Sequence, residues 1–144
     1  MVKDYDLERF LKAQESDYAI ALSEIRNGRK QSHWMWYIFP QIAGLGLSVT
    51  SKFYAIEGLP EAGEYLEHSI LGKRLIEISK VLTQIEGKTA NQIFGSPDDL
   101  KLKSCMTLFC AVKNTHPVFQ EVLDKYFNGK QDLKTLALIN HSDR

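Results

Sequence analysis

The stretch ILGKRLIEISKVLTQIEG, residues 70–87, decides the fold class. Its apolar residues recur every three or four positions, which places them on one face of an α-helix. This apolar face consists of Ile70, Leu71, Leu75, Ile78, Val81, Leu82 and Ile85. Gly87 follows the pattern and is typical of a helix end, because glycine readily adopts the left-handed backbone that closes a helix. The stretch therefore predicts a long amphipathic helix that packs against other helices.

The segments on both sides of this helix are also helical in pattern. Upstream, the spacing predicts two helices between Leu7 and Gly28, separated by a cap signal at Ser16–Asp17. PEAGEYLEH (60–68) then begins with a proline at a first-turn position. Downstream, we expect a short helical turn at NQIFG (91–95). The start signal Ser96-Pro97-Asp98-Asp99 then opens a helix over LKLKSCMTLFCAVK (100–113). Two further helices are expected over VFQEVLDKYFNG (118–129) and QDLKTLALI (131–139).

One segment favours a strand. SVTSKFYAI (48–56) is rich in β-branched and aromatic residues, which are enriched in sheets. A lone strand is poor evidence for a sheet. We therefore predict an all-α protein with about seven helices and at most a minor β element, in a single helical domain over residues 1–144.

The composition narrows the class of function. The chain has 18 basic and 18 acidic residues, and this balance argues against broad binding to nucleic acid or to membrane surfaces, although a small local basic patch is compatible with it. No apolar run reaches membrane-spanning length, and the first ten residues show no signal-peptide core. We expect a cytoplasmic protein. Cys105 and Cys110, five residues apart, match no zinc motif and are interpreted as reduced core thiols.

The segment HWMWYIFPQ (33–41) is the strongest candidate for a binding site. Aromatic side chains are expected in any core, so a buried role is one interpretation. The other is the wall of a pocket, because Trp34 and Trp36 provide faces on which a ring stacks. His33 adds an imidazole that can donate or accept a hydrogen bond, and Arg29 and Lys30 bring two cations suited to phosphate. This combination suits a nucleotide-like ligand.

Three other patterns in the sequence give weaker signals for a binding site. Gly44-x-Gly46 lacks the strand–glycine–helix context of a dinucleotide loop, so we expect no cofactor. Glu64 and His68 share a helical face, but a solvated acidic face explains them better than a metal site, and we expect no metal. The helix start at Asp98–Asp99, with Lys101 close by, is explained by the helix dipole, although such a start also attracts anions.

Long motifs give the chain a family resemblance. GRKQSHWMWYIFPQIAGLG (28–46), EAGEYLEHSILGKRL (61–75), IFGSPDDLKLKSCMTLF (93–109) and DLKTL (132–136) resemble the bacterial family catalogued as domain of unknown function 1810. The similarity covers roughly residues 6–138 and implies a small, mostly helical, cytoplasmic protein of one domain. Some members are labelled "calpastatin", a class of disordered and repetitive inhibitors that core-forming helices do not fit.

The family is in turn distantly similar to the NADAR superfamily, which is linked to NAD and ADP-ribose. The similarity lies in the early Trp-rich segment and in a late helix that holds Lys103, Met106 and Phe109 with a different spacing. It implies action on N-glycosidic bonds of ribosylated compounds, including phosphoribosyl and ADP-ribosylated ones. Because the spacing differs, no catalytic residue is carried over from that superfamily.

Two hypotheses of function follow from these observations. In the first, the protein hydrolyses the N-glycosidic bond of a phosphorylated ribosyl or ADP-ribose-type compound. His33 would act as the acid, and Glu61 or Asp99 would face the sugar cation. In the second, the protein is not an enzyme and binds a nucleotide-like ligand or a protein segment. The residues expected to bind the small-molecule ligand are Arg29, Lys30, Trp34, Trp36, Gln41 and Lys101. A third interpretation leaves the aromatic segment as core alone.

Overall fold

The computed structural model describes residues 4–142 and is all-α over that range. The single domain predicted for residues 1–144 includes residues 1–3 and 143–144, which lie outside the described range. The helices of the described range are α1 (Glu8–Arg26), α2 (Met35–Ile38), α3 (Val49–Phe53), α4 (Leu59–Glu67), α5 (Leu71–Gln84), α6 (Ala90–Phe94), α7 (Asp98–Cys110), α8 (Val118–Phe127) and α9 (Leu133–Ser142). They confirm the predicted fold class, with two short helices more than expected.

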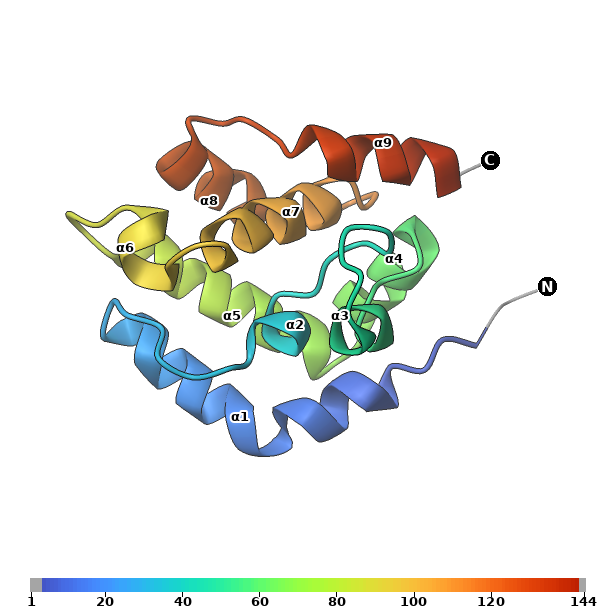
Figure 1. Ribbon diagram of the computed structural model, residues 1–144, viewed down its shortest axis with the longest axis horizontal. Coiled ribbons are helices and arrows are strands. Elements are labelled where there is room, and N and C mark those ends of the chain that lie inside the picture. The colour runs from blue at the N-terminus through green and yellow to red at the C-terminus, as the bar shows by residue number, and fades with distance from the viewer. Residues whose placement is uncertain (1–3, 143–144) are drawn as a thin grey trace.

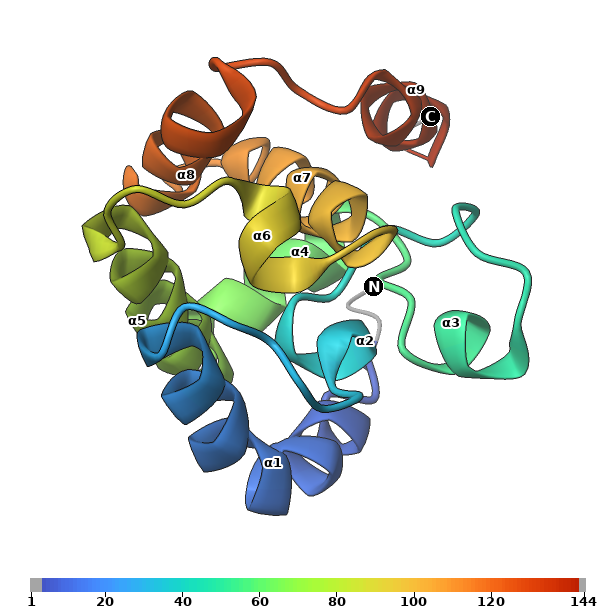
Figure 2. The ribbon, with the colours of Figure 1, turned by 60° about the vertical axis from the view of Figure 1, so that its left-hand side comes forward.

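The helices form layers around α5. Figure 1 shows α1 along one side of the molecule and α8 and α9 along the opposite side, with α5 and α7 between them. Helix α5 packs against α1, α4 and α8, and α7 packs against α4, α6, α8 and α9. In Figure 2, α3 stands at the edge of the molecule, and α9 lies on the same side.

Most of the apolar face predicted for residues 70–87 packs into the core, whereas Ile70, just before the helix begins, is 43% exposed. Leu71, Leu75, Ile78 and Leu82 are at most 1% exposed. Because this face turns inward along the whole of α5, the flanking helices can bury their own apolar residues against it. The helix ends one residue before Ile85, slightly earlier than the glycine at position 87 predicts.

The prediction of a strand over residues 48–56 is wrong. Residues 49–53 form α3, and the Ser48 hydroxyl caps it by accepting a hydrogen bond from the backbone N–H of Ser51. The β-branched Val49 and the aromatic Phe53 are 87% and 55% exposed. Their side chains do not pack against a neighbouring strand, which is the contact that gives such residues their strand propensity. The β element that remains in the described range is an isolated parallel bridge between Ile42 and Ile56.

The helix break expected at Ser16–Asp17 is also absent. Helix α1 continues through both residues to Arg26, and Gly28 follows its end with a φ of +74°. The Asp17 carboxylate accepts a hydrogen bond from the Tyr37 hydroxyl instead of capping a helix. A residue type that favours caps is tolerated inside a helix when its side chain finds another partner.

Candidate functional site

A cavity of about 320 Å³ opens beside α2 and forms the candidate site; we call it the Trp36 cavity. Three segments far apart in the sequence enclose it: residues 36–55, the start of α7 and the start of α9. Its volume is at the lower end of the range for small-molecule sites. The side chains of most interest along its wall are those of Trp36, Gln41, Ser51, Lys52, Tyr54, Leu100, Lys101, Ser104, Asp132 and Lys134.

An indole and an ammonium group lie together in this cavity. The Lys101 Nζ is 3.8 Å from the centroid of the Trp36 ring, which is a cation–π contact. The same Nζ lies 3.1 Å from the Asp98 Oδ1. Because Trp36 is only half-buried, its ring remains accessible from the cavity. An anion that pairs with Lys101 would therefore come within reach of the indole.

The loop between α2 and α3 fixes Gln41 at the cavity wall. The backbone N–H of Ile56 donates to the Gln41 carbonyl at 2.8 Å, and the N–H of Ala43 donates to the Ile56 carbonyl at 2.7 Å. Gly46 allows the loop to close tightly, because a Cβ at this position would lie 2.5 Å from the Ser51 Cβ. The loop is therefore held on both sides where it borders the cavity.

Asp132 is the one carboxylate among the side chains that line this cavity. Its Oδ2 accepts hydrogen bonds from the Ser104 hydroxyl at 3.1 Å, from the Thr135 N–H at 3.1 Å and from the Thr135 hydroxyl. The Asp132 N–H donates to the Thr107 hydroxyl at 2.9 Å. These bonds tie the start of α9 to α7, so both walls of the cavity keep a fixed separation.

Trp34, two residues before Trp36, is not part of the site wall. Its side chain is 1% exposed and packs against Phe39 and Phe94, with ring centroids 6.1 and 6.5 Å away. Its indole Nε1 donates to the Glu24 Oε1 at 2.8 Å. No face of this ring is open to a ligand, and the stacking role expected for it has no support in its surroundings.

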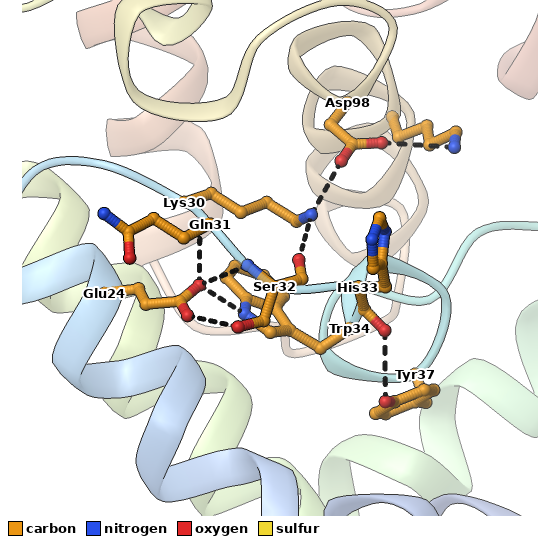
Figure 3. Close-up of polar contacts among 9 residues, drawn as sticks. Glu24, Lys30, Gln31, Ser32, His33, Trp34, Tyr37 and Asp98 are labelled. Carbon is orange, nitrogen blue, oxygen red and sulfur yellow. Dashed lines mark hydrogen bonds and ion pairs between the residues drawn. The ribbon is translucent and has the colours of Figure 1, made fainter.

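Glu24 holds the segment before α2 in place. As Figure 3 shows, its carboxylate gathers hydrogen bonds from the N–H groups of Gln31 and Ser32, from the Ser32 hydroxyl and from the Trp34 indole. Burial acts to raise the pKa of Glu24, but these hydrogen bonds outweigh it and lower the pKa to about 2 from an ordinary 4.5. The ionised carboxylate therefore stabilises the native loop.

We expect Glu24→Gln to weaken the pH dependence of the free energy of unfolding on the acidic side, between about pH 5 and about pH 2. A carboxylate whose pKa falls on folding stabilises the native state above its unfolded pKa, and this contribution disappears as pH drops from about 5 to about 2. At pH 7 the variant should lose about 1–2 kcal/mol, less than the full pKa difference implies, because solvent screens this site. Urea unfolding at a series of pH values measures the effect. The control is Glu15→Gln, because Glu15 is an exposed residue of α1. If the free energy of unfolding changed with pH by the same slope in both variants, the account would be contradicted.

Arg29 and Lys30, which precede the aromatic segment, and His33, its first residue, lie outside the cavity wall. The Lys30 Nζ forms an ion pair with the Asp98 Oδ2 at 3.0 Å and donates to the Ser32 carbonyl. Arg29 and His33 are exposed. In Figure 3 the His33 imidazole points away from the Glu24 carboxylate, while its carbonyl accepts a bond from the Tyr37 hydroxyl. Lys30 contacts the start of α7 through Asp98, but none of the three residues lines the cavity.

The two carboxylates expected to face a sugar cation also lie elsewhere. Glu61 is 2% exposed, and its Oε2 pairs with the Arg9 guanidinium at 3.0 Å while its Oε1 accepts the Glu57 N–H. The Asp99 Oδ1 accepts the N–H of Leu100 at 2.8 Å, at the first turn of α7. Neither residue lines the Trp36 cavity.

The structure therefore brings together Trp36, Gln41 and Lys101 from the expected set and adds residues that the sequence did not single out. The additions are Ser51, Lys52, Tyr54, Ser104, Asp132 and Lys134. A sequence signal existed for three of them, because the motif DLKTL (132–136) contains Asp132 and Lys134 and the motif at 93–109 contains Ser104. Among residues 4–142, no cluster of three or more metal-ligating side chains occurs, and no helix has the length and apolarity to cross a bilayer.

Comparisons with known proteins identify the family and the fold. The model of a family described as "Protein of unknown function (DUF1810)" matches residues 4–139. The chain is also similar to the crystal structure of the conserved hypothetical protein Rv1873 from Mycobacterium tuberculosis. The two share 45% sequence identity with a TM-score of 0.93, over 94% of this chain and 97% of that one. No curated protein matches the chain significantly. The resemblance to the NADAR superfamily stays a prediction.

Proposed function

The chain belongs to the DUF1810 family of proteins of unknown function, and we propose that its Trp36 cavity binds a small anionic ligand with a flat ring, such as a nucleotide. One observation carries the proposal. Trp36 and Gln41 of the aromatic segment and Lys101 of α7, which the sequence suggested as ligand-binding residues, line the same cavity. An aromatic wall, a few polar groups and a local cation are the usual contents of a small-molecule site.

The charges around the cavity support an anionic ligand. Lys52, Lys101 and Lys134 line it, and Asp132 alone opposes them there. Neither Lys52 nor Lys134 forms an ion pair with any residue between positions 4 and 142. An ammonium group without a carboxylate partner is available to a phosphate or a carboxylate of a ligand. The Gln41 amide can both donate and accept, which suits the edge of a base.

Hydrolysis of an N-glycosidic bond in a phosphorylated ribosyl or ADP-ribose-type compound is a second candidate function. The observation in its favour is Asp132, a carboxylate in the same cavity as the indole and the lysines. Such a group can stabilise an oxocarbenium-like sugar while a water oxygen bonds to the anomeric carbon and the C–N bond breaks. The departing base would take a proton from that water. Binding without cleavage is favoured because His33, Glu61 and Asp99 do not line the cavity.

A thermal-shift experiment with AMP, NAD, ADP-ribose and ribose 5-phosphate tests the proposal. A ligand that binds the native state at a hundred times its Kd adds about 2.7 kcal/mol and raises the melting temperature by several degrees. We expect at least one ring-bearing anion to do so. Trp36→Ala and Lys101→Gln should each remove most of the shift, while the exposed lysine variant Lys80→Gln should retain it.

Chromatography of the ligand recovered afterwards separates the two candidate functions. Intact ligand after prolonged incubation supports a binding protein. Release of free base that Asp132→Asn abolishes supports the hydrolase. If none of the four compounds raised the melting temperature, both functions would be contradicted, because the cavity would then bind no nucleotide-like ligand.

A further inference from the structure

The carboxylate of Asp132 has a fixed orientation at the wall of the Trp36 cavity. Its Oδ2 accepts hydrogen bonds from the Ser104 hydroxyl at 3.1 Å, from the Thr135 N–H at 3.1 Å and from the Thr135 hydroxyl. The Asp132 N–H donates to the Thr107 hydroxyl at 2.9 Å. Each of these partner residues is at most 7% exposed. The carboxylate therefore cannot turn without breaking bonds to buried groups.

The second oxygen of this carboxylate, Oδ1, has no partner among residues 4–142. The hydrogen bonds to the carboxylate all end on Oδ2, and no ion pair within that range includes Asp132. An ionised carboxylate oxygen accepts hydrogen bonds and donates none. Oδ1 is therefore an acceptor in a fixed place, available to a donor group of a ligand.

The bond to Ser104 decides which side of the chain this carboxylate faces. Asp132 also borders a second hollow, of about 550 Å³, together with Lys103 and residues 129–131. Ser104 lines the Trp36 cavity but not this hollow. Because the carboxylate is bonded to the Ser104 hydroxyl, it belongs to the wall of the Trp36 cavity.

Asp132 and Lys101 place opposite charges in one cavity. Lys101 and Ser104 are three positions apart on α7 and both line the cavity, so their Cβ atoms are about 5–6 Å apart on one helical face. The carboxylate bonded to Ser104 is therefore close to the residue that attracts an anion. It repels a phosphate, whereas a neutral hydroxyl can donate to it. In a nucleotide, one sugar carries the phosphate and the hydroxyls, so a phosphate at Lys101 brings hydroxyls near Asp132.

We propose that the Asp132 Oδ1 accepts a hydrogen bond from the 2′- or 3′-hydroxyl of the ligand's ribose, so that the Trp36 cavity selects a ribonucleotide over its deoxy analogue. This inference rests on the proposed function and specifies its ligand class. The bond is charge-assisted, because the acceptor is an ionised carboxylate. A deoxy analogue lacks the donor and leaves Oδ1 unpaired inside the site.

Isothermal titration of the wild-type protein with AMP, 2′-deoxy-AMP and 3′-deoxy-AMP tests the inference. At least one of the two deoxy analogues should bind about tenfold more weakly than AMP, or weaker still, as expected for one lost hydrogen bond to a charged group. This comparison needs no variant, so it does not depend on whether a substitution at Asp132 disturbs the fold.

Two variants assign the preference to Asp132. Asp132→Asn keeps the size of the side chain and removes its charge, and the preference should fall to about threefold or less, because a neutral hydrogen bond has about half the strength. Its affinity for the weaker analogue should be kept, which shows that the cavity is intact. Ser104→Ala removes one bond that orients the carboxylate and should lower the preference by a smaller factor. The control Asp124→Asn, at an exposed position of α8, should keep the full preference.

Equal affinities of the wild-type protein for all three nucleotides would overturn the inference and leave the proposed function standing. A full preference in both Asp132→Asn and Ser104→Ala would also overturn it, because another group would then bind the hydroxyl. The same holds if Asp124→Asn lost the preference, since net charge and not position would explain the effect. Absence of binding by all three nucleotides would overturn the proposed function and the inference with it.

Discussion

Trp34→Ala is expected to lower the free energy of unfolding by about 3–5 kcal/mol, the usual range for truncating a large buried aromatic residue. The Trp34 side chain is 1% exposed and packs against Phe39 and Phe94. Its removal leaves a cavity and also deprives Glu24 of one of its hydrogen bonds. Urea unfolding monitored by circular dichroism measures the loss.

Trp36→Ala is the matched comparison, because the same residue type stands two positions away. Trp36 is half-buried, and its ring contacts the Lys101 ammonium. We expect it to lose about 1 kcal/mol, as for a partly exposed cation–π pair. Equal losses in the two variants would contradict the assignment of Trp34 to the core and Trp36 to the site.

Glu61→Ala should be the second strongly destabilising change, by about 3–5 kcal/mol. Its carboxylate pairs with Arg9, whose side chain is 10% exposed, and removal of one partner leaves a buried charge uncompensated. The Glu57 N–H would lose its acceptor as well. Thermal and urea unfolding measure the effect.

The same variant separates a structural role of Glu61 from the catalytic role that the sequence suggested. Glu67→Ala, at an exposed position of the same helix, should stay within about 0.5 kcal/mol of wild type. If Glu61→Ala kept full stability and lost only a turnover activity, the buried ion pair would not be its function and the catalytic hypothesis would regain support.

The helical framework could be predicted because its signal is local. The apolar face of α5 follows from spacing alone, and Pro60 lies in the first turn of α4 as its position in the sequence predicts. The prediction failed at α3, where residues 48–56 have strand propensity but find no partner strand. Strand propensity describes a fit to a half-buried sheet, and no sheet forms in the described residues.

The site could be predicted only in part, because long-range packing decides which aromatic residue faces a cavity. Trp34 and Trp36 are two positions apart at a single turn of helix, and residues with this spacing do not share a face. A nine-residue apolar segment does not show which of them turns inward. Lys52, Tyr54 and Asp132 join the site because distant segments meet there, which spacing along the chain does not reveal.

The central claim, that Trp36 and not Trp34 faces a bound ligand, is tested most directly by NMR. The chain contains two tryptophans, so a ¹⁵N-labelled sample gives two indole N–H signals, which Trp36→Ala assigns. During titration with ADP, the Trp36 signal should shift progressively and saturate, while the Trp34 signal, whose N–H is bonded to Glu24, should stay in place. A saturating titration that moves only the Trp34 signal, or one that moves neither, would contradict the account.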